Sequence, residues 1–226
     1  MTNKIIGIQG DKLDKINISS DTSIFLAHEA QQLGYKIFYY TPSNLSIIKN
    51  KTYANGVFLK FNYERKKFYK IYKKQKIDVE NLKFILIRQD PPFNSEYLIT
   101  TLILDGLKKV KVINNPTAIR NVSEKLYSKH FIKYMPNTLF SNNIVEIKKF
   151  YNQNKSIIMK PINGYGGNQI HLIKDKFNKK LITNFLNKNG HSMFQKFLKN
   201  ISKGDKRVFI INGKVCGAIS RVPKKG

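Results

Sequence analysis

The sequence has little or none of several residue types, and each scarcity excludes a class of protein. Its 226 residues include one cysteine, Cys216, and no tryptophan. A single cysteine excludes a disulfide-stapled scaffold and a cysteine-based zinc site, and it fits a reducing, cytoplasmic compartment. No apolar run approaches the roughly 18 residues of a membrane-spanning helix, so no membrane partner is expected. The first residues also lack the charged and apolar regions of a secretory signal.

Acidic residues are scarce as well: 14 carboxylates face 41 basic side chains, for a formal net charge of +27. Such an excess can indicate a nucleic-acid or anionic-membrane partner. Only five of the basic residues are arginine, and the lysines are spread along the whole chain. Asparagine and isoleucine are abundant too, as AT-rich codons produce. We interpret the charge as compositional bias on solvated faces and expect no nucleic-acid partner, with a basic nucleic-acid binder as a remote alternative.

The first part of the sequence alternates strand and helix patterns, as α/β domains with a parallel sheet do. Asp21 and Thr22 are candidate caps for its first helix, and Gly34 ends that helix. The Asn55-Gly56 pair predicts a two-residue hairpin turn between two further strands. The other expected elements are strands at 4–9, 36–40, 84–88 and 110–113, with helices at 23–33 and 96–106.

The pattern changes near residues 118–123, where we place a domain boundary. Beyond it the sequence predicts an antiparallel α+β arrangement, and Asn212-Gly213 predicts a hairpin of the last two strands. The expected strands are 138–141, 157–160, 169–173, 192–197, 207–211 and 215–220, and the expected helices are 121–131, 143–154 and 176–187.

A glycine-rich loop is the sharpest local signal for chemistry. Residues 159–168 carry three glycines between two predicted strands, with Lys160 beside them. Glycines let backbone N–H groups approach an anion closely. No Gly-Lys-Ser/Thr follows, so the loop is not a Walker motif, and no helix opens after it, so it is not a dinucleotide fingerprint. On these residues alone, an ordinary glycine-rich hairpin turn stays open.

Polar side chains follow two predicted strands of the first domain. Arg88 ends one strand and precedes a stiff Asp-Pro-Pro segment, while Asp11 and Asn17 lie in the loop after the first strand. Side chains beyond the carboxyl ends of parallel strands commonly face a ligand crevice. The alternatives are a surface arginine and a solvated loop.

Six short segments, which follow one another along the chain, together resemble the motifs of one known family. The whole sequence resembles the bacterial glutathione synthetases of the ATP-grasp superfamily. The glycine loop alone would indicate only ATP-grasp, whereas Arg-x-Asp-Pro-Pro-Phe and Gly-Asp-Lys-Arg make the match specific. The segments that carry it are residues 7–18, 88–93, 113–116, 123–127, 159–167 and 204–208.

The resemblance implies a fold and an activity. It implies a Rossmann-like, pre-ATP-grasp α/β domain at residues 1–120. An incomplete ATP-grasp domain would follow at 121–226, holding the first half and the start of the second. The family joins the carboxylate of γ-glutamylcysteine to the amine of glycine, using ATP and Mg²⁺, with Mn²⁺ as an alternative metal. ATP converts the carboxylate into an acyl phosphate, which glycine then attacks.

The resemblance also assigns nucleotide-binding residues. Lys125 and Lys160 match the family's phosphate lysines, and residues 164–167 match its mobile loop over the phosphates. Residues 195–198 match the segment between the two ATP-grasp halves, whose backbone would meet adenine. The ATP-binding residues implied in this way are Lys125, Lys160, Gly164, Gly166, Gly167, Gln195, Lys196, Leu198 and the acidic Asp205.

The remaining assignments concern the reacting groups. Arg207 and Arg221 match arginines near the transferred phosphoryl group and the acceptor carboxylate, which makes them the implied catalytic residues. Asp11, Asn17 and Arg88 match the part of the site that would hold γ-glutamylcysteine. No metal ligand is implied within the chain, because the family's ligands are expected beyond residue 226.

Two alternatives to this function stay open besides the nucleic-acid binder. One is an inactive ATP-binding fragment. The other is a different ATP-grasp carboxylate–amine ligase, against which the Arg-x-Asp-Pro-Pro-Phe segment argues. The expected partners are the small molecules γ-glutamylcysteine, glycine and ATP. A second copy of the chain, or a C-terminal piece supplied in trans, would be a further partner.

We predict that these 226 residues do not catalyse ligation alone. After Glu146 the only carboxylates are Asp175 and Asp205, whereas one or two carboxylates together with phosphates usually fix Mg²⁺ at a nucleotide. Losing metal neutralisation would lower the rate by several orders of magnitude. The measurement is glutathione and phosphate release, with and without the C-terminal piece. Robust glutathione formation by the purified chain alone would contradict the prediction.

Overall fold

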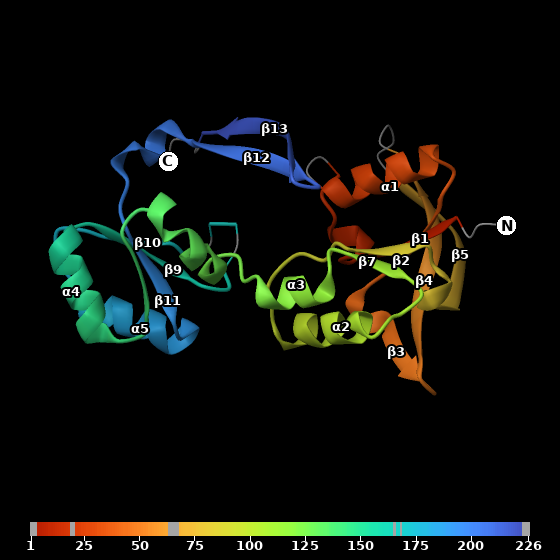
Figure 1. Ribbon diagram of the computed structural model, residues 1–226, viewed down its shortest axis with the longest axis horizontal. Coiled ribbons are helices and arrows are strands. Elements are labelled where there is room, and N and C mark those ends of the chain that lie inside the picture. Colours follow the sequence, from red (N-terminus) through yellow and green to blue (C-terminus); the bar gives the residue numbers. More distant parts are fainter. Residues whose placement is uncertain (1–3, 19–20, 63–67, 165, 168, 223–226) are drawn as a thin grey trace. The chain divides into compact units, whose positions relative to one another are not determined.

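The computed structural model describes residues 4–18, 21–62, 68–164, 166–167 and 169–222 (Figure 1). The chain divides into two compact units, Met1–Ser123 and Glu124–Gly226. Each unit has a sheet and hydrophobic core of its own, so each is described by itself. None of the helices in the described part of the chain has the length and hydropathy that crossing a membrane requires.

The first unit is built on a sheet of seven described strands. Its order is β3-β4-β2-β1-β6-β7, with β5 paired to β4. Strand β1 lies between β2 and β6 and is parallel to both, and β7 continues the parallel part beyond β6. The bounds are β1 Ile5–Gln9, β2 Lys36–Tyr40, β3 Leu45–Ile48, β4 Lys51–Phe61, β5 Tyr69–Asp78, β6 Phe84–Ile87 and β7 Lys111–Ile113.

Helices cover both faces of this sheet. Helix α1, Thr22–Gln32, packs Ile24 and Ala27 into one core cluster. Helix α2, Ser95–Asp105, packs Leu104 into the other, and α3, Pro116–Asn121, follows β7. The predicted cap of the first helix is confirmed, because the Asp21 carboxylate accepts hydrogen bonds from two backbone N–H groups of the first turn.

The hairpin turn predicted at Asn55-Gly56 is wrong. Strand β4 runs straight through both residues, and its turn lies earlier, at Lys49 and Asn50, which adopt φ values of 47° and 60°. Gly56 serves close packing instead. A Cβ there would lie 2.5 Å from the Phe38 ring and from a backbone oxygen of β2. A glycine needed for close approach therefore looked like a turn glycine in the sequence.

The second unit holds a four-stranded antiparallel sheet and a separate two-stranded sheet among its described residues. The order of the first is β10-β9-β11-β8, and α4 and α5 pack on it around Ile157 and Phe194. Strands β12 and β13 form the other sheet, a hairpin whose residues are all exposed. The bounds are β8 Thr138–Ser141, α4 Ile144–Asn154, β9 Ile157–Pro161, β10 His171–Ile173, α5 Lys179–Asn189, β11 Ser192–Lys196, β12 Asp205–Ile211 and β13 Lys214–Arg221.

The helix predicted at 121–131 is also wrong. Helix α3 ends at Asn121, and a 3₁₀ segment occupies Leu126–Tyr134, with a non-helical kink at Phe131. The Ser128 hydroxyl donates to the Lys125 carbonyl. Such a local side-chain bond competes with the helical ladder and favours a tighter turn.

Replacing Gly56 by alanine should destabilise the first unit by about 1–3 kcal/mol, the usual cost of overpacking. The added methyl group would meet a backbone oxygen that cannot move away as a flexible side chain could. Unfolding in urea followed by circular dichroism measures the change. Gly106→Ala, in the same unit, is the matched control, because a Cβ there would lie an ordinary 3.6 Å from the Ile103 carbonyl oxygen. Equal stability of the two variants would contradict the packing role of Gly56.

Candidate functional site

The second unit brings together two lysines that lie 35 residues apart in the sequence. Lys160 stands in β9, and its ammonium donates to the Gln195 side-chain carbonyl at 2.8 Å. Gln195 is buried in β11 and is itself oriented by a 2.9 Å bond to the Thr138 hydroxyl. The Lys125 ammonium donates to the carbonyl of Gly164, the first glycine of the loop. We call Lys125 and Lys160 the lysine pair.

The lysine pair is electrostatically unfavourable without a ligand. Burial lowers the pKa of Lys160 below the ordinary lysine value, and the positive charge of Lys125 lowers it further. An anion placed between the two ammonium groups would remove the repulsion and replace the lost hydration. The chemistry of this donor set therefore fits a phosphate group.

The glycine loop joins this site through its first residue. Gly166 and Gly167 have φ values of 62° and 76°, a region that side-chain-bearing residues rarely adopt. A Cβ at Gly164 would lie 2.4 Å from the Pro161 ring. Tyr165 and Asn168 of the predicted loop lie outside the described residues. Glycine is thus required here by backbone conformation and by close packing.

The other predicted nucleotide and catalytic residues are divided between two places. The Lys196 N–H donates to the Asn137 carbonyl at 2.8 Å, and Leu198 is half-exposed just after β11. Three others lie on the separate β12–β13 hairpin rather than on the sheet of the lysine pair. They are Asp205, Arg207 and Arg221.

Two of the hairpin residues bind each other. The Arg221 guanidinium contacts both carboxylate oxygens of Asp205, at 2.7 Å from Nε and 2.5 Å from Nη2. These hydrogen bonds lower the pKa of Asp205 below its ordinary value. The resemblance placed Asp205 in the nucleotide pocket and Arg221 among the catalytic residues, and it did not predict their pairing.

The first unit contains a second candidate site, a pocket of about 220 Å³ that we call the carboxylate pocket. All three residues predicted to hold the dipeptide line it, from the loops that follow β1 and β6. The Arg88 guanidinium donates to the Ser23 hydroxyl of α1 at 3.0 Å. The Asp90 N–H donates to the Asp11 carboxylate at 2.9 Å and joins the two loops. The lining residues are Asp11, Lys15, Ile16, Asn17, Asp21, Thr22, Arg88 and Asp90.

Charges of both signs meet in the carboxylate pocket. Desolvation raises the pKa of Asp90 above its ordinary value, the carboxylates of Asp11 and Asp21 raise it further, and Arg88 opposes the shift. A ligand with one cationic and one anionic group would suit both sets of side chains. Sequence reasoning missed Asp21 and Asp90 as pocket residues, although Asp90 stands two positions after Arg88 in the quoted motif.

The described residues do not build a metal site on their own. Nowhere in the described part of the chain do three histidine, cysteine or carboxylate side chains gather closely enough to hold a metal ion. The lysine pair and the glycine loop offer cations and amides, which suit phosphate oxygens rather than Mg²⁺.

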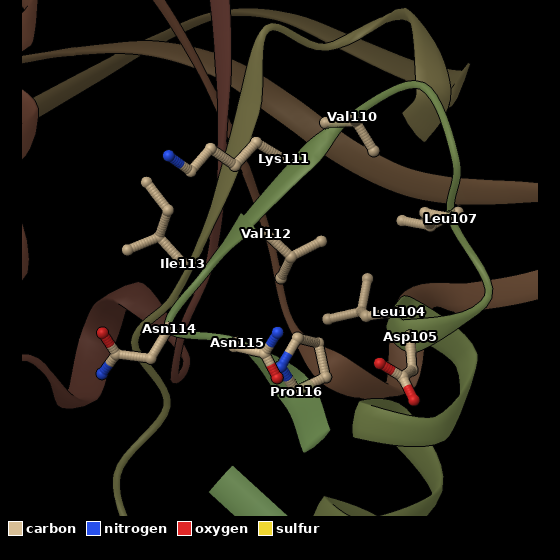
Figure 2. Close-up of a pocket in the computed structure, with 10 residues that line it drawn as sticks. All are labelled: Leu104, Asp105, Leu107, Val110, Lys111, Val112, Ile113, Asn114, Asn115 and Pro116. Atoms are coloured by element: carbon tan, nitrogen blue, oxygen red, sulfur yellow. The ribbon is translucent and has the colours of Figure 1, made fainter. Parts of the chain in front are cut away.

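A larger hollow of about 430 Å³ lies beside edge strand β7 and contains none of the predicted site residues (Figure 2). Figure 2 shows Val112 facing Leu104 of α2, while Lys111 and Ile113 project from the opposite side of the strand. One of its amides, Asn115, already caps α3 by accepting the Ala118 N–H at 2.9 Å. Its carboxylate, Asp105, is already bonded to Thr117 and Arg120, so the hollow is a weaker candidate than the other two sites.

Comparisons with known proteins agree with the two-part layout. Residues 5–120 match the family model for the N-terminal domain of prokaryotic glutathione synthetase, and residues 124–226 match the model for its ATP-grasp domain. The glutathione synthetase of Mesorhizobium japonicum is 35% identical over 222 residues, which cover 96% of this chain and 71% of that protein. The protein of the same name from Buchnera aphidicola subsp. Acyrthosiphon pisum is 34% identical, over 98% of this chain and 71% of that protein.

Solved structures of lower identity share the fold. D-cycloserine synthetase DcsG matches with a TM-score of 0.62 at 11% identity, over 96% of this chain and 68% of that one. A RimK domain ATP-grasp protein from Sphaerobacter thermophilus matches with a TM-score of 0.61 at 12% identity, over 96% and 72%. These matches confirm the predicted fold class. The chain spans about 70% of the length of the curated relatives it matches.

The depressed pKa of Lys160 gives a pH-dependent stability. The folded chain releases this proton at a lower pH than the unfolded chain does, so between the two pKa values the unfolded state binds more protons. The free energy of unfolding should therefore rise with pH across that window. The rise should be smaller in Lys160→Met, measured by urea unfolding at pH 7 to 10. Lys188→Met, an exposed lysine of α5, is the control and should follow the wild type. Parallel curves for wild type and Lys160→Met would contradict the assignment.

Proposed function

Because this chain belongs to the prokaryotic glutathione synthetase family, we propose that it binds γ-glutamylcysteine and ATP for ligation to glycine through an acyl phosphate. The family is one of ATP-dependent ligases. One observation carries the proposal for this chain: Lys125 and Lys160 converge beside the glycine loop within the segment that matches the ATP-grasp model.

The lysine pair would bind the nucleotide triphosphate. Two ammonium groups held close together gain most from a polyanion, which relieves their mutual repulsion. The Gln195 side-chain carbonyl already holds the Lys160 ammonium in place, so this side chain needs little reordering when phosphate binds. The glycine loop, tied to Lys125 through the Gly164 carbonyl, would cover the phosphates. Lys196 and Leu198 would meet adenine, and Asp205 would complete the nucleotide pocket.

The carboxylate pocket would bind the γ-glutamyl end of the dipeptide. That end carries an α-ammonium and an α-carboxylate on one carbon, and the pocket offers both partners. The Arg88 fork would take the carboxylate. Asp11 and Asp90 would take the ammonium, whose charge offsets the repulsion that raises the pKa of Asp90. Asn17 would add an amide from the same wall.

The two domains would divide the substrates. We assign the dipeptide to residues 1–120 and the nucleotide to residues 121–226. Arg207 would stabilise the transferred phosphoryl group, and Arg221 would meet the acceptor carboxylate once it exchanges Asp205 for substrate. A divalent cation, Mg²⁺ with Mn²⁺ as the alternative, enters this proposal as a partner of the nucleotide and not of the described side chains. The reaction would take place in the cytoplasm.

Calorimetry with two ligands and two variants tests the proposal. Lys160→Ala should weaken ATP binding by the equivalent of about 1.5–3 kcal/mol, the value of a charge-assisted hydrogen bond, and leave the dipeptide unaffected. Arg88→Lys keeps the charge and loses the fork, so it should weaken γ-glutamylcysteine binding and leave ATP unaffected. Lys188→Ala, an exposed lysine of α5, is the control for both ligands. The proposal fails if Lys160→Ala binds ATP as the wild type does, or if Arg88→Lys affects ATP instead of the dipeptide.

A further inference from the structure

A buried amide pair joins the end of β1 to the loop after β6, and both segments lead into the carboxylate pocket. The Gln9 side-chain amide, at the end of β1, donates to the side-chain carbonyl of Gln89, which is 80 residues away in the sequence. Gln9 is fully buried and Gln89 is 8% exposed. The Gln89 amide in turn reaches the Thr100 hydroxyl of α2 at 3.5 Å, and that hydroxyl donates to the Tyr97 carbonyl. One polar chain thus links a strand, a loop and a helix.

Stability alone does not account for this pair. The Oε1 atom of Gln9 is buried and has no hydrogen-bond partner among the described residues. An acceptor left without a partner in the interior lowers the free energy of unfolding, whereas two apolar side chains of similar size would carry no such penalty. The polar pair therefore supplies something other than stability. Unlike apolar packing, a hydrogen bond fixes the orientation of the two groups that it joins.

This fixed orientation affects the carboxylate pocket, because both glutamines lie within two residues of residues that line it. Gln89 lies between Arg88 and Asp90, and Gln9 lies two positions before Asp11. Arg88 turns toward α1, where it meets Ser23, and Gln89 turns toward α2 on the other side of the loop. The loop after β6 is therefore fixed between the two helical layers.

We propose that the Gln9–Gln89 amide pair is a positioning device that sets the spacing between Arg88 and the pocket carboxylates. The inference rests on the proposed function, in which those groups hold the two charges of the γ-glutamyl end. Backbone bonds tie the same loops nearby, since the Arg88 N–H donates to the Gln9 carbonyl at 2.7 Å. The side-chain pair adds a second tie one residue further along, so the loop cannot rotate about the first. Neither glutamine touches substrate in this arrangement.

Three methionine variants test the inference, because methionine matches the length of glutamine without its hydrogen bonds. Gln9→Met and Gln89→Met should each weaken γ-glutamylcysteine binding three- to tenfold and leave ATP binding unchanged. Each should also speed amide hydrogen exchange at Asp90, measured by NMR without ligand. Gln75→Met, an exposed glutamine of β5 in the same unit, is the control and should change neither quantity.

The double variant separates positioning from packing. Each single variant leaves the remaining buried amide without its partner and should therefore lower the melting temperature. With both polar groups removed, the melting temperature should return toward the wild-type value, while dipeptide affinity stays low and Asp90 exchange stays fast. If affinity recovers together with the melting temperature, the pair is only structural and the inference is overturned. If the wild-type chain binds no dipeptide, the proposed function fails. Asp90 exchange then decides the inference: faster exchange in both single variants supports the tie, and unchanged exchange refutes it.

Discussion

The pairing of β1 with parallel strands on both sides is the constraint on which the first unit depends. It places Gln9 level with Tyr40 of β2 and with Ile87 of β6, so the chain leaves the sheet at one edge after each strand. The loops that carry Asp11 and Arg88 must then lie side by side. The bond from Asp90 to Asp11 and the Gln9–Gln89 amide pair both follow from that adjacency.

Each candidate site holds like charges close together: two lysines in the second unit, and three carboxylates beside Arg88 in the first. Lys125 depresses the pKa of Lys160 in the second unit, and Asp11 and Asp21 help to raise that of Asp90 in the first. Each site is strained electrostatically until a ligand of opposite charge arrives. The chain has a net charge of +27, so the carboxylate pocket is also unusual in gathering several acidic side chains. In both sites, a ligand of opposite charge would gain binding free energy by relieving the repulsion between like charges.

What the sequence could predict depended on how far apart the partners lie. The Asp21 cap and the Asn212-Gly213 turn are local, and local chemistry specified them. The meeting of Asp11 with Arg88 followed from a general rule about parallel strands. The bond from Lys125 to Gly164 and the pairing of Gln9 with Gln89 have no periodic signal, because only tertiary packing brings those residues together. Strand β5, rich in lysine, was missed since its outer face is solvated and resembles a charged loop.

The exposed β12–β13 hairpin has a consequence for handling the protein. Residues 208–211 read Val-Phe-Ile-Ile, an uncharged, β-favouring run in a strand that the other described residues leave exposed. Such segments template cross-β stacking between molecules. Lys206, Arg207 and Lys214 flank the run and act as gatekeepers, because stacked copies would bring like charges into register. That protection is electrostatic and weakens as the Debye length shortens. We therefore expect concentrated salt to lower the colloidal stability of this chain by screening these charges.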